Sequence, residues 1–210
     1  THMHMPSPSS NYQSFDGDKD VLAKNLWQRL NPDRWPLKFA DLPEGTVLVG
    51  GAVRDCLFGK TELKPDLDLV VRANAIPLAQ KLAKKLGGKY ILLDSARDIA
   101  RLVLEGWTID FAAQFDRDLH KDLYRRDYRL NAIALTLQNN PRLVDPTGGL
   151  EDIKQKRLVA ISENNLLEDP LRLLRAIRLM AEHDLSAESQ TLFWIKSHAG
   201  ALSNSAPERI

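Results

Sequence analysis

The sequence predicts an α/β (α+β) fold: a head with a small mixed β-sheet and helices packed on it, then an all-helical second part. Three observations support this prediction. Up to residue 112, apolar segments typical of strands alternate with helical segments in the order β-α-β-α-β-β-β. From about residue 161 onward only helical patterns remain. The 210 residues, 43% of them hydrophobic, suffice for one ordinary domain with a helical extension.

The first half of the chain supplies the predicted sheet. A stripe of Leu22, Leu26 and Leu30 indicates the first helix. Glycines end the next two helices, at Gly59 and at Gly87. β-Branched and aromatic residues favour strands in the last three segments. The expected elements are a helix over 18–30, a strand over 46–49, a helix over 52–58, a strand over 67–71, a helix over 76–86, and strands over 90–93, 99–104 and 107–112.

The pattern changes after residue 113. Asp169 is expected to cap a strong helix that has Pro170 in its first turn. We expect a head domain over residues 18–160 and a helical neck over residues 161–210, whose last residues resemble the start of another element. The expected elements are a short charged segment over 115–123, a helical turn running into a strand over 124–137, a tight turn over 145–149, and helices over 169–182 and 187–198.

Composition narrows the classes of function. The net charge of +1 provides no overall basic field, so any contact with nucleic acid must be local. The single cysteine, Cys56, excludes an internal disulfide framework and indicates a reducing, cytoplasmic compartment. No apolar run is long enough to span a membrane, and no signal peptide is visible. Residues 1–17 are interpreted as an expression tag, ending before Met5, followed by a flexible N-terminus.

Two aspartates on one predicted strand are the first candidates for chemistry. Asp66 and Asp68 are two residues apart, so both carboxylates point to the same face, with backbones ~7 Å apart. Neighbouring carboxylates repel each other unless a cation lies between them, and Mg²⁺ prefers oxygen ligands and also binds phosphates. The alternative is a pair of solvated aspartates at a strand edge. The apolar strand that follows and the glycine loop that precedes favour the metal site.

That glycine loop is the second candidate. Gly50 and Gly51 follow a strand and precede a helix, where backbone N–H groups attract anions. Arg54 adds a forked contact to the same anion, and Asp55 is a candidate partner that positions Arg54. The alternative is a plain strand-to-helix turn, because a glycine pair alone is neither a Walker loop nor a dinucleotide fingerprint.

Polar residues within or before two later strands extend the candidate site. Asp110 lies among apolar residues of a strand, where a carboxylate needs a cation or a hydrogen-bond partner. Two interpretations remain: Asp110 is a third metal ligand, or it is a surface aspartate that faces outward. Arg126, Asp127 and Asn131 belong to a dense polar cluster that binds phosphate or ribose hydroxyls in the functional interpretation. In the structural interpretation the cluster is a salt-bridged turn.

The start of the helix at Asp169 offers a base-reading surface. Asp169 and Arg172 are three residues apart and share a helix face, with Glu168 beside them. A carboxylate that accepts next to a guanidinium that donates complements the base edge of cytosine or adenine. The alternative is that Asp169 only caps the helix and Arg172 is exposed. Arg175 continues a basic line that is either solvated or faces phosphates.

Taken together, these motifs resemble the class II tRNA nucleotidyltransferase (CCA-adding enzyme) and bacterial poly(A) polymerase family. The resemblance covers about residues 46 to 180, with four motifs in the right order. The family more often has Phe and Thr-Ile where this chain has Tyr128 and Arg129-Leu130. The motifs are Gly50-Gly51-Ala-Val-Arg54-Asp55 with Asp66-Leu-Asp68, Arg125-Arg126-Asp127-Tyr-Arg-Leu-Asn131, Asp145-Pro-Thr-Gly-Gly149, and Glu168-Asp169-Pro-Leu-Arg172-Leu-Leu-Arg175.

The resemblance implies a polymerase β-like nucleotidyltransferase head followed by a helical neck. It implies that Asp66 and Asp68 hold two Mg²⁺ ions, one activating the attacking 3′-hydroxyl and the other steadying the triphosphate and leaving pyrophosphate. It also implies that Arg126 and Asp127 contact phosphate and ribose. Body and tail domains that grip tRNA would follow residue 210. The implied protein template for CTP and ATP consists of Glu168, Asp169 and Arg172.

The hypothesis is therefore a nucleotidyltransferase that adds C and/or A from CTP or ATP to tRNA 3′ ends without a nucleic-acid template. Residues 111–124, a segment shorter than in full CCA-adding members, separate Asp110 from Arg125, which favours a CC-adding subtype. Two alternatives remain: a poly(A) polymerase that adds AMP to RNA 3′ ends, and a nucleotide- or RNA-binding module without chemistry. The intact carboxylates argue against the binding module.

Overall fold

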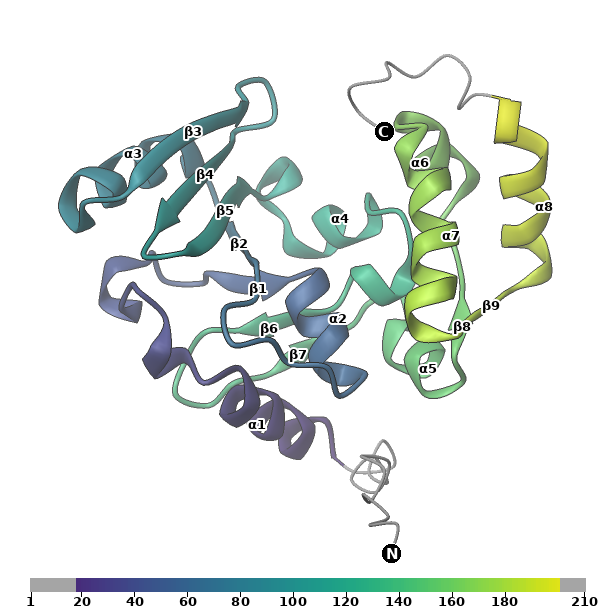
Figure 1. Cartoon of the computed structure of the whole chain (residues 1–210), viewed down its shortest axis with the longest axis horizontal. Helices are drawn as coiled ribbons and strands as arrows, with labels where there is room; N and C mark the ends of the chain where they lie inside the picture. Colours follow the sequence, from purple (N-terminus) through teal and green to yellow (C-terminus); the bar gives the residue numbers. More distant parts are fainter. Residues whose placement is uncertain (1–17, 201–210) are drawn as a thin grey trace, which may run out of the picture.

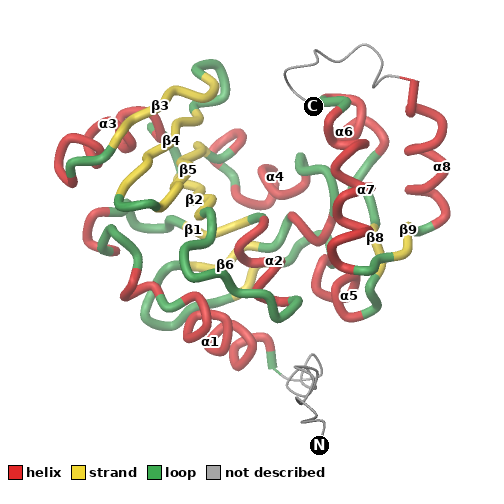
Figure 2. The backbone as a smooth tube through the Cα atoms, viewed as in Figure 1, coloured by secondary structure: helices red, strands yellow, loops and turns green. Residues whose placement is uncertain are grey.

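The protein is described from a computed structural model that places residues 18–200. The expectations for residues 1–17 and 206–210 lie outside these described residues. Figure 1 shows the sheet and its helices as one half of the molecule, with α6, α7 and α8 grouped beside it. The tube view shows that helices and loops surround the strands on this half (Figure 2). None of the helices in residues 18–200 combines the length and the apolar character needed to cross a bilayer.

Seven strands form one mixed sheet in the order β3-β4-β5-β2-β1-β6-β7. β2 and β5 pair in parallel, and the other neighbours pair antiparallel. A separate parallel pair joins β8 to β9. The strands are β1 (Val47–Val49), β2 (Leu67–Val71), β3 (Lys89–Asp94), β4 (Ile99–Leu104), β5 (Trp107–Ala113), β6 (Ala134–Thr136), β7 (Leu143–Val144), β8 (Arg157–Leu158) and β9 (Ser186–Ala187).

The helices begin and end at ordinary signals. The side chain of Asp18 accepts from the N–H of Asp20 at the start of α1, and Gly87 ends α3 with a left-handed backbone. Short 3-10 turns, such as Arg129–Asn131, complete the connections. The α-helices are α1 (Lys19–Leu30), α2 (Gly51–Leu57), α3 (Ala75–Leu86), α4 (Leu119–Tyr124), α5 (Gly149–Lys154), α6 (Glu163–Glu168), α7 (Leu171–His183) and α8 (Ser189–His198).

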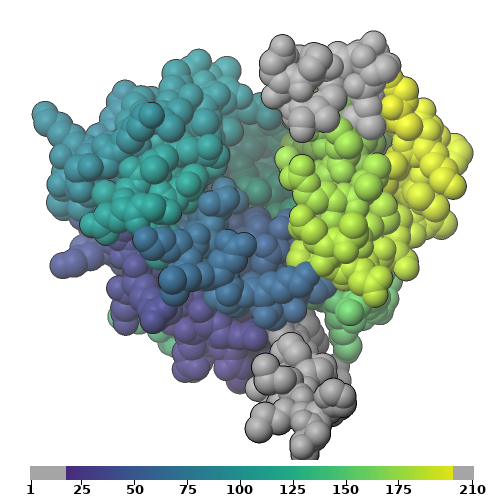
Figure 3. Space-filling view, in the orientation of Figure 1, coloured from purple at the N-terminus to yellow at the C-terminus, as the bar shows by residue number. Residues whose placement is uncertain are grey.

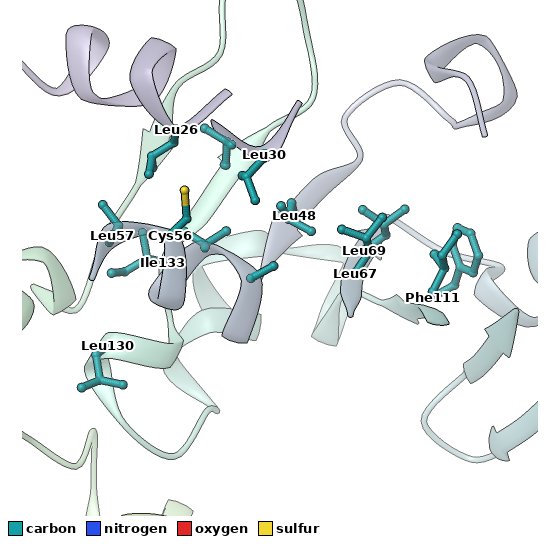
Figure 4. Close-up of a cluster of buried hydrophobic side chains, with 14 of the residues drawn as sticks. Leu26, Leu30, Leu48, Cys56, Leu57, Leu67, Leu69, Phe111, Leu130 and Ile133 are labelled. Carbon is teal, nitrogen blue, oxygen red and sulfur yellow. The ribbon is translucent and has the colours of Figure 1, made fainter. Parts of the chain in front are cut away.

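The two faces of the sheet differ in what they bury. Odd-numbered residues of β2 and β5, such as Leu69 and Phe111, belong to the main hydrophobic core, which Figure 4 shows in part. Even-numbered residues point the other way because successive strand residues alternate between faces. On that second face, Val70 joins a smaller cluster that includes Leu123 of α4. Asp68 and Asp110 therefore lie on the second face, away from the main core.

The main core also joins the head to the helices that follow it. Buried side chains of α7, such as Leu173 and Leu179, belong to the same cluster as Leu57 of α2 and Leu130. Because apolar burial contributes about 25 cal/mol per Å², a shared core holds α7 against the head. Helix α7 therefore packs against the head through one shared hydrophobic core.

The structure confirms the expected fold class and the order β-α-β-α-β-β-β. Strands β2 and β4 have the expected bounds, and the tight turn over 145–149 forms because both carboxylate oxygens of Asp145 accept backbone N–H groups. One detail differs from the all-helical expectation for residues 161–210. The chain returns as β9 to pair with β8, because the short loop after α7 lies beside residues 157–158.

Candidate active site at the head–neck junction

An acidic row, Asp68 and Asp110, crosses two neighbouring strands and is followed by Arg101 on a third. Asp68 of β2 lies in register with Asp110 of the parallel strand β5, and Asp110 lies in register with Arg101 of β4. Residues in register on neighbouring strands share a face of the sheet. Arg101 binds Asp110 through two hydrogen bonds, from Nε at 2.8 Å and from Nη2 at 3.1 Å. Asp110 therefore stands beside Asp68, but both of its oxygens are engaged by Arg101.

The electrostatics of this row centre on Asp68. Burial, helped by the negative charges of Asp110 and Asp66, raises the pKa of the Asp68 carboxyl to about 6, while Arg126 and Arg101 oppose the shift. Clustered carboxylates disfavour ionisation unless a positive charge neutralises them. A cation bound between Asp66 and Asp68 would remove this repulsion.

The glycine turn lies directly against Asp68. Gly50 has φ 73° and ψ −140°, a combination that residues with a β-carbon rarely adopt. A β-carbon at Gly50 would stand 3.0 Å from Oδ2 of Asp68. Gly51 begins α2, and a β-carbon there would stand 3.4 Å from Nη2 of Arg54. The turn thus brings bare backbone, one guanidinium and one carboxylate into the same small region.

This region opens into a cleft of about 460 Å³. We call it the carboxylate cleft; the residues that line it include Gly51, Arg54, Lys60, Asp66, Asp68 and His183. Both candidate metal ligands therefore face one cleft together with the glycine turn. The combination of carboxylates and cationic side chains around one cleft suits a polyphosphate that binds together with a divalent metal.

A chain of hydrogen bonds connects the glycine turn to α7. Nη1 of Arg54 donates to Oδ1 of Asn131 at 2.7 Å, and Nδ2 of Asn131 donates to Oδ1 of Asp127 at 3.1 Å. The other oxygen of Asp127 accepts from Nη1 of Arg175 at 2.7 Å. Asp127 is 3% exposed and Arg175 is its ion-pair partner from α7. Asp127 is therefore buried and paired, whereas the side chain of its partner Arg175 remains 48% exposed.

A second hollow shares no lining residue with the carboxylate cleft. We call it the arginine cleft; it measures about 530 Å³ and its lining includes Arg97, Gln114, Arg125, Arg126, Glu168 and Arg172. The space-filling view shows the surface hollowed between the region of β3–β5 and α7 (Figure 3). Nε of Arg126 is buried without a hydrogen-bond partner among the described residues, so it is a donor left for a ligand.

The candidate base-reading residues are placed differently from one another. Arg172 lines the arginine cleft, where Nη1 donates to the carbonyl oxygens of Asn165 at 2.6 Å and Arg125 at 3.3 Å. Oε2 of Glu168 lies 3.5 Å from the same Nη1. Asp169 lines neither cleft, and its Oδ1 accepts from the N–H of Leu171 at 3.0 Å. The capping interpretation of Asp169 therefore has a bond to support it.

Several residues that the sequence reasoning missed contribute to the two clefts. Arg101 forms an ion pair with Asp110. The signal in the sequence was that Arg101 is a charged residue within an otherwise apolar strand. Lys60 and His183 line the carboxylate cleft, although no motif contains them. Lys60 follows Gly59 after α2, and His183 ends α7, so only the packing of these helices brings the two side chains together.

The donor set at Asp66 and Asp68 fits a divalent metal. Within residues 18–200, no three His, Cys, Asp or Glu side chains already form a cluster arranged to ligate an ion. Mg²⁺ usually binds through one or two carboxylates and takes its remaining ligands from water and substrate phosphates. Two carboxylates facing one cleft, one with a raised pKa, match that mode of binding.

Comparison with known proteins places the chain in a family. A family model described as the poly(A) polymerase head domain matches residues 46–159, which is more than half of the chain. The chain belongs to the poly(A) polymerase head domain family. The matched range begins just before β1 and contains the glycine turn, the acidic row and Asp127. Proteins of this nucleotidyltransferase family generally use a divalent metal.

Individual members of the family are similar in both sequence and structure. The CC-adding tRNA nucleotidyltransferase of Synechocystis is 40% identical over 175 residues, covering 83% of this chain and 42% of the relative. The A-adding tRNA nucleotidyltransferase of Deinococcus radiodurans is 40% identical over 149 residues, covering 71% of this chain and 33% of the relative. A solved complex of a CCA-adding enzyme with CTP superposes with a TM-score of 0.72 at 33% identity, covering 88% of this chain and 47% of that one.

These relatives confirm the resemblance to the CCA-adding enzymes and the head fold. The chain spans less than half the length of each of the three. Both CC-adding and A-adding members are among them, so the family includes more than one choice of nucleotide.

Proposed function

We propose that this chain is the head and neck portion of a tRNA nucleotidyltransferase. The reaction is the addition of C and/or A, from CTP or ATP, to the tRNA 3′ end without a nucleic-acid template. The observation that supports it most is that Asp66 and Asp68 face one cleft together with Gly51 and Arg54. Carboxylates and a phosphate-compatible turn in one cleft are the minimum that nucleotidyl transfer requires.

The roles of the chain's own residues follow from their positions. Asp66 and Asp68 would hold two Mg²⁺ ions, which when bound activate the 3′-hydroxyl and stabilise the pyrophosphate leaving group. Arg54 would bind the triphosphate at the glycine turn. Arg126 would donate its unpartnered Nε to a phosphate or ribose oxygen. Asp110 would keep Arg101 in place beside the two carboxylates rather than ligate the metal itself.

Arg172 and Glu168 are the residues we propose to read the base from the arginine cleft, with Asp169 acting from the adjoining helix start. Arg172 supplies donors and Glu168 supplies an acceptor, which together complement cytosine or adenine. We propose the CC-adding subtype, because the short segment 111–124 between Asp110 and Arg125 contains only the end of β5, a 3-10 turn and the short helix α4. Cytoplasmic location is proposed with it, since the sequence contains one cysteine, Cys56, and therefore cannot form an internal disulfide.

The experiment that tests the function is single-turnover addition by the full-length protein with Mg²⁺. The substrates are tRNA ending before CCA and tRNA ending in CC, each offered CTP or ATP separately. CC addition predicts two cytidines on the first tRNA and no adenosine on the second. Addition of A to tRNA ending in CC would instead assign the CCA- or A-adding subtype. Incorporation of neither nucleotide, with Asp68→Asn indistinguishable from the wild type, would remove the proposal.

A poly(A) polymerase is the second candidate, because the family model that matches carries that description. It predicts long A-tails on unrelated RNA and little use of CTP. A binding module without chemistry predicts RNA binding that survives Asp66→Ala and Asp68→Ala and no release of pyrophosphate. Measuring pyrophosphate release with tRNA and with an unrelated RNA of equal length separates the three.

A further inference from the structure

The C-terminal end of α7 docks on the glycine-turn helix α2 through His183. This side chain is the last residue of α7 and is 6% exposed. Its ring stacks on Phe58, with ring centroids 4.2 Å apart and planes 13° apart. The neighbouring Lys60 donates to the carbonyl oxygen of Glu182, which closes the contact from the other side. Figure 1 shows α7 and α2 side by side at this level.

The two ring nitrogens of His183 have different neighbours. Nδ1 lies 3.4 Å from Nζ of Lys60, and Nε2 lies 3.2 Å from Oδ1 of Asp55. A lysine ammonium only donates, so Nδ1 must accept and the proton of the neutral ring belongs on Nε2. Nε2 is buried and has no aligned hydrogen-bond partner, although the Asp55 carboxylate is its nearest acceptor. The structure therefore places a buried N–H group of α7 within 3.2 Å of the Asp55 carboxylate, as a close polar contact rather than an aligned hydrogen bond.

Asp55 in turn holds the arginine of the glycine turn. The same Oδ1 accepts from Nε of Arg54 at 2.8 Å, and the Arg54 side chain is only 13% exposed. On its other edge, Arg54 begins the hydrogen-bond chain through Asn131 and Asp127 to Arg175. Arg175 and His183 both belong to α7, about 12 Å apart along the helix axis. Polar contacts thus connect Arg54 to α7 in two ways, through Asn131 and Asp127 to Arg175 and through Asp55 to His183.

We propose that His183 is a positioning residue that acts through Asp55 to hold the guanidinium of Arg54 at the glycine turn. This inference rests on the proposed function for the role of Arg54 in binding the triphosphate. With His183 in place, both edges of Arg54 are tied to α7, the helix that also carries Arg172. The position of Arg54 then depends on how α7 packs on the head. Because α7 also carries Arg172, binding of the base and binding of the phosphates are coupled.

A packing role for His183 makes a different prediction, and three variants separate the two. His183→Leu introduces an apolar side chain and removes the N–H, whereas His183→Gln retains a side-chain N–H donor. Phe58→Leu removes the ring stacking and leaves the His183–Asp55–Arg54 contacts available. If packing alone matters, His183→Leu is harmless and Phe58→Leu is not. If positioning matters, the order is reversed for substrate affinity.

The kinetic test is steady-state nucleotide addition by the full-length protein. In His183→Leu we expect KM for CTP or ATP to rise about tenfold with kcat within about twofold, because an interaction made in both ground and transition states is weakened. His183→Gln should recover most of the loss, and Phe58→Leu should lower the melting temperature without changing KM. An unchanged KM in His183→Leu, or a His183→Gln variant no better than His183→Leu, would overturn the proposal.

A second measurement does not depend on activity. In NMR spectra of the 210-residue protein, the Nε–H proton of Arg54 should exchange slowly with solvent. The reason is its hydrogen bond to Oδ1 of Asp55. We expect exchange at least about tenfold faster in His183→Leu and near wild-type exchange in His183→Gln. Exchange that is unchanged in His183→Leu contradicts the positioning role. If the exchange rates follow this expectation while the wild-type enzyme adds neither CTP nor ATP, the proposed function fails but the positioning of Arg54 by His183 is supported.

Discussion

The backbone of Gly50 lies so close to the carboxylate of Asp68 that a β-carbon on Gly50 would stand 3.0 Å from Oδ2. This close approach couples the conformation of the glycine turn to the position of the half-buried Asp68 carboxylate. The turn is free to take its unusual backbone angles only because Gly50 lacks a side chain. One residue thus serves both the local fold and the geometry of the carboxylate cleft.

Replacing Gly50 with alanine should therefore abolish nucleotide addition. We expect Gly50→Ala to destabilise the protein by about 1–2 kcal/mol, because alanine is strained at this backbone conformation. The β-carbon should also displace Asp68, lowering kcat/KM by at least about a hundredfold. Gly87→Ala is the matched control: φ is 77° there, but nothing lies within 4 Å of the added carbon. Activity retained by Gly50→Ala at a temperature where it is folded would contradict the prediction.

The raised pKa of Asp68 predicts an unusual gain in stability from its loss. Between its ordinary value of 3.8 and about 6, the folded protein binds more protons at Asp68 than the unfolded chain does. The contribution of Asp68 to stability therefore falls as pH rises through this window and stays low above it. At pH 7.5, Asp68→Asn should be more stable than the wild type by about 2 kcal/mol, yet inactive.

Urea unfolding at pH 7.5 and at pH 4 checks this prediction, since the difference between the two proteins should shrink towards the lower pH. Asp33→Asn, a change at an exposed acid, serves as the control and should shift neither curve by more than about 0.5 kcal/mol. An Asp68→Asn variant that is less stable at pH 7.5 than at pH 4, relative to the wild type, would show that Asp68 is stabilised rather than strained.

A metal test follows from the same carboxylate. A cation that binds only the folded protein raises its melting temperature in proportion to ln(1 + [L]/Kd). We expect millimolar Mg²⁺ to raise the melting temperature of the wild type at pH 7.5 and to have little effect on Asp68→Asn. Calcium and sodium chloride at equal ionic strength separate specific binding from screening. Equal shifts in both proteins would place the metal elsewhere.

The buried aspartate Asp152 should be essential for stability but not for chemistry. Its side chain is fully buried and binds two arginines, Arg129 at 2.7 and 2.6 Å and Arg157 at 2.7 Å. Removing one member of a buried charge cluster leaves its partners uncompensated, so Asp152→Ala should cost about 3–5 kcal/mol. The control is Asp116→Ala, which breaks an exposed pair with Lys121 and should cost no more than about 1 kcal/mol. Chemical denaturation measures both; similar losses would refute the distinction.

Tyr128 predicts a graded effect on base selection. Its hydroxyl donates to the carbonyl oxygen of Arg172 at 2.7 Å, and burial raises the pKa of the Tyr128 phenol, which keeps the proton in place. Tyr128→Phe removes only this bond and should cost about 1 kcal/mol of stability. Because the bond anchors the first turn of α7, discrimination between CTP and UTP should fall about threefold to tenfold. Competition assays with both nucleotides check this, and unchanged discrimination would limit Tyr128 to packing.

Much of the fold was predictable because it depends on local patterns. The leucine stripe of α1, the apolar run of β2 and the β-branched segment of β4 each exceed the length over which a period becomes visible. The two-residue strands β7, β8 and β9 were not predicted, because two residues show no period and pair only when a distant segment lies beside them. The short helices α5 and α6 were missed for the same reason.

The site was predictable to a similar degree. The sequence identified Asp66, Asp68, Gly51 and Arg54, and the structure places all four around one cleft. It did not reveal that Arg101 occupies both oxygens of Asp110, or that Asp127 binds Arg175. Such partners lie on different elements of the chain. The spacing of residues within one helix or strand does not predict which other element packs beside it.

The sequence by itself determined which residues carry charge, which backbone positions require glycine, and which face of each strand a side chain occupies. These properties follow from covalent structure and from the period of the local backbone. Only the tertiary structure decided that β2 pairs in parallel with β5, which sets Asp68 beside Asp110, and that α7 reaches back to Arg54 through Arg175 and His183. Those contacts depend on how the whole hydrophobic core packs, because burial of apolar surface selects among the strand orders and helix positions that local patterns leave open.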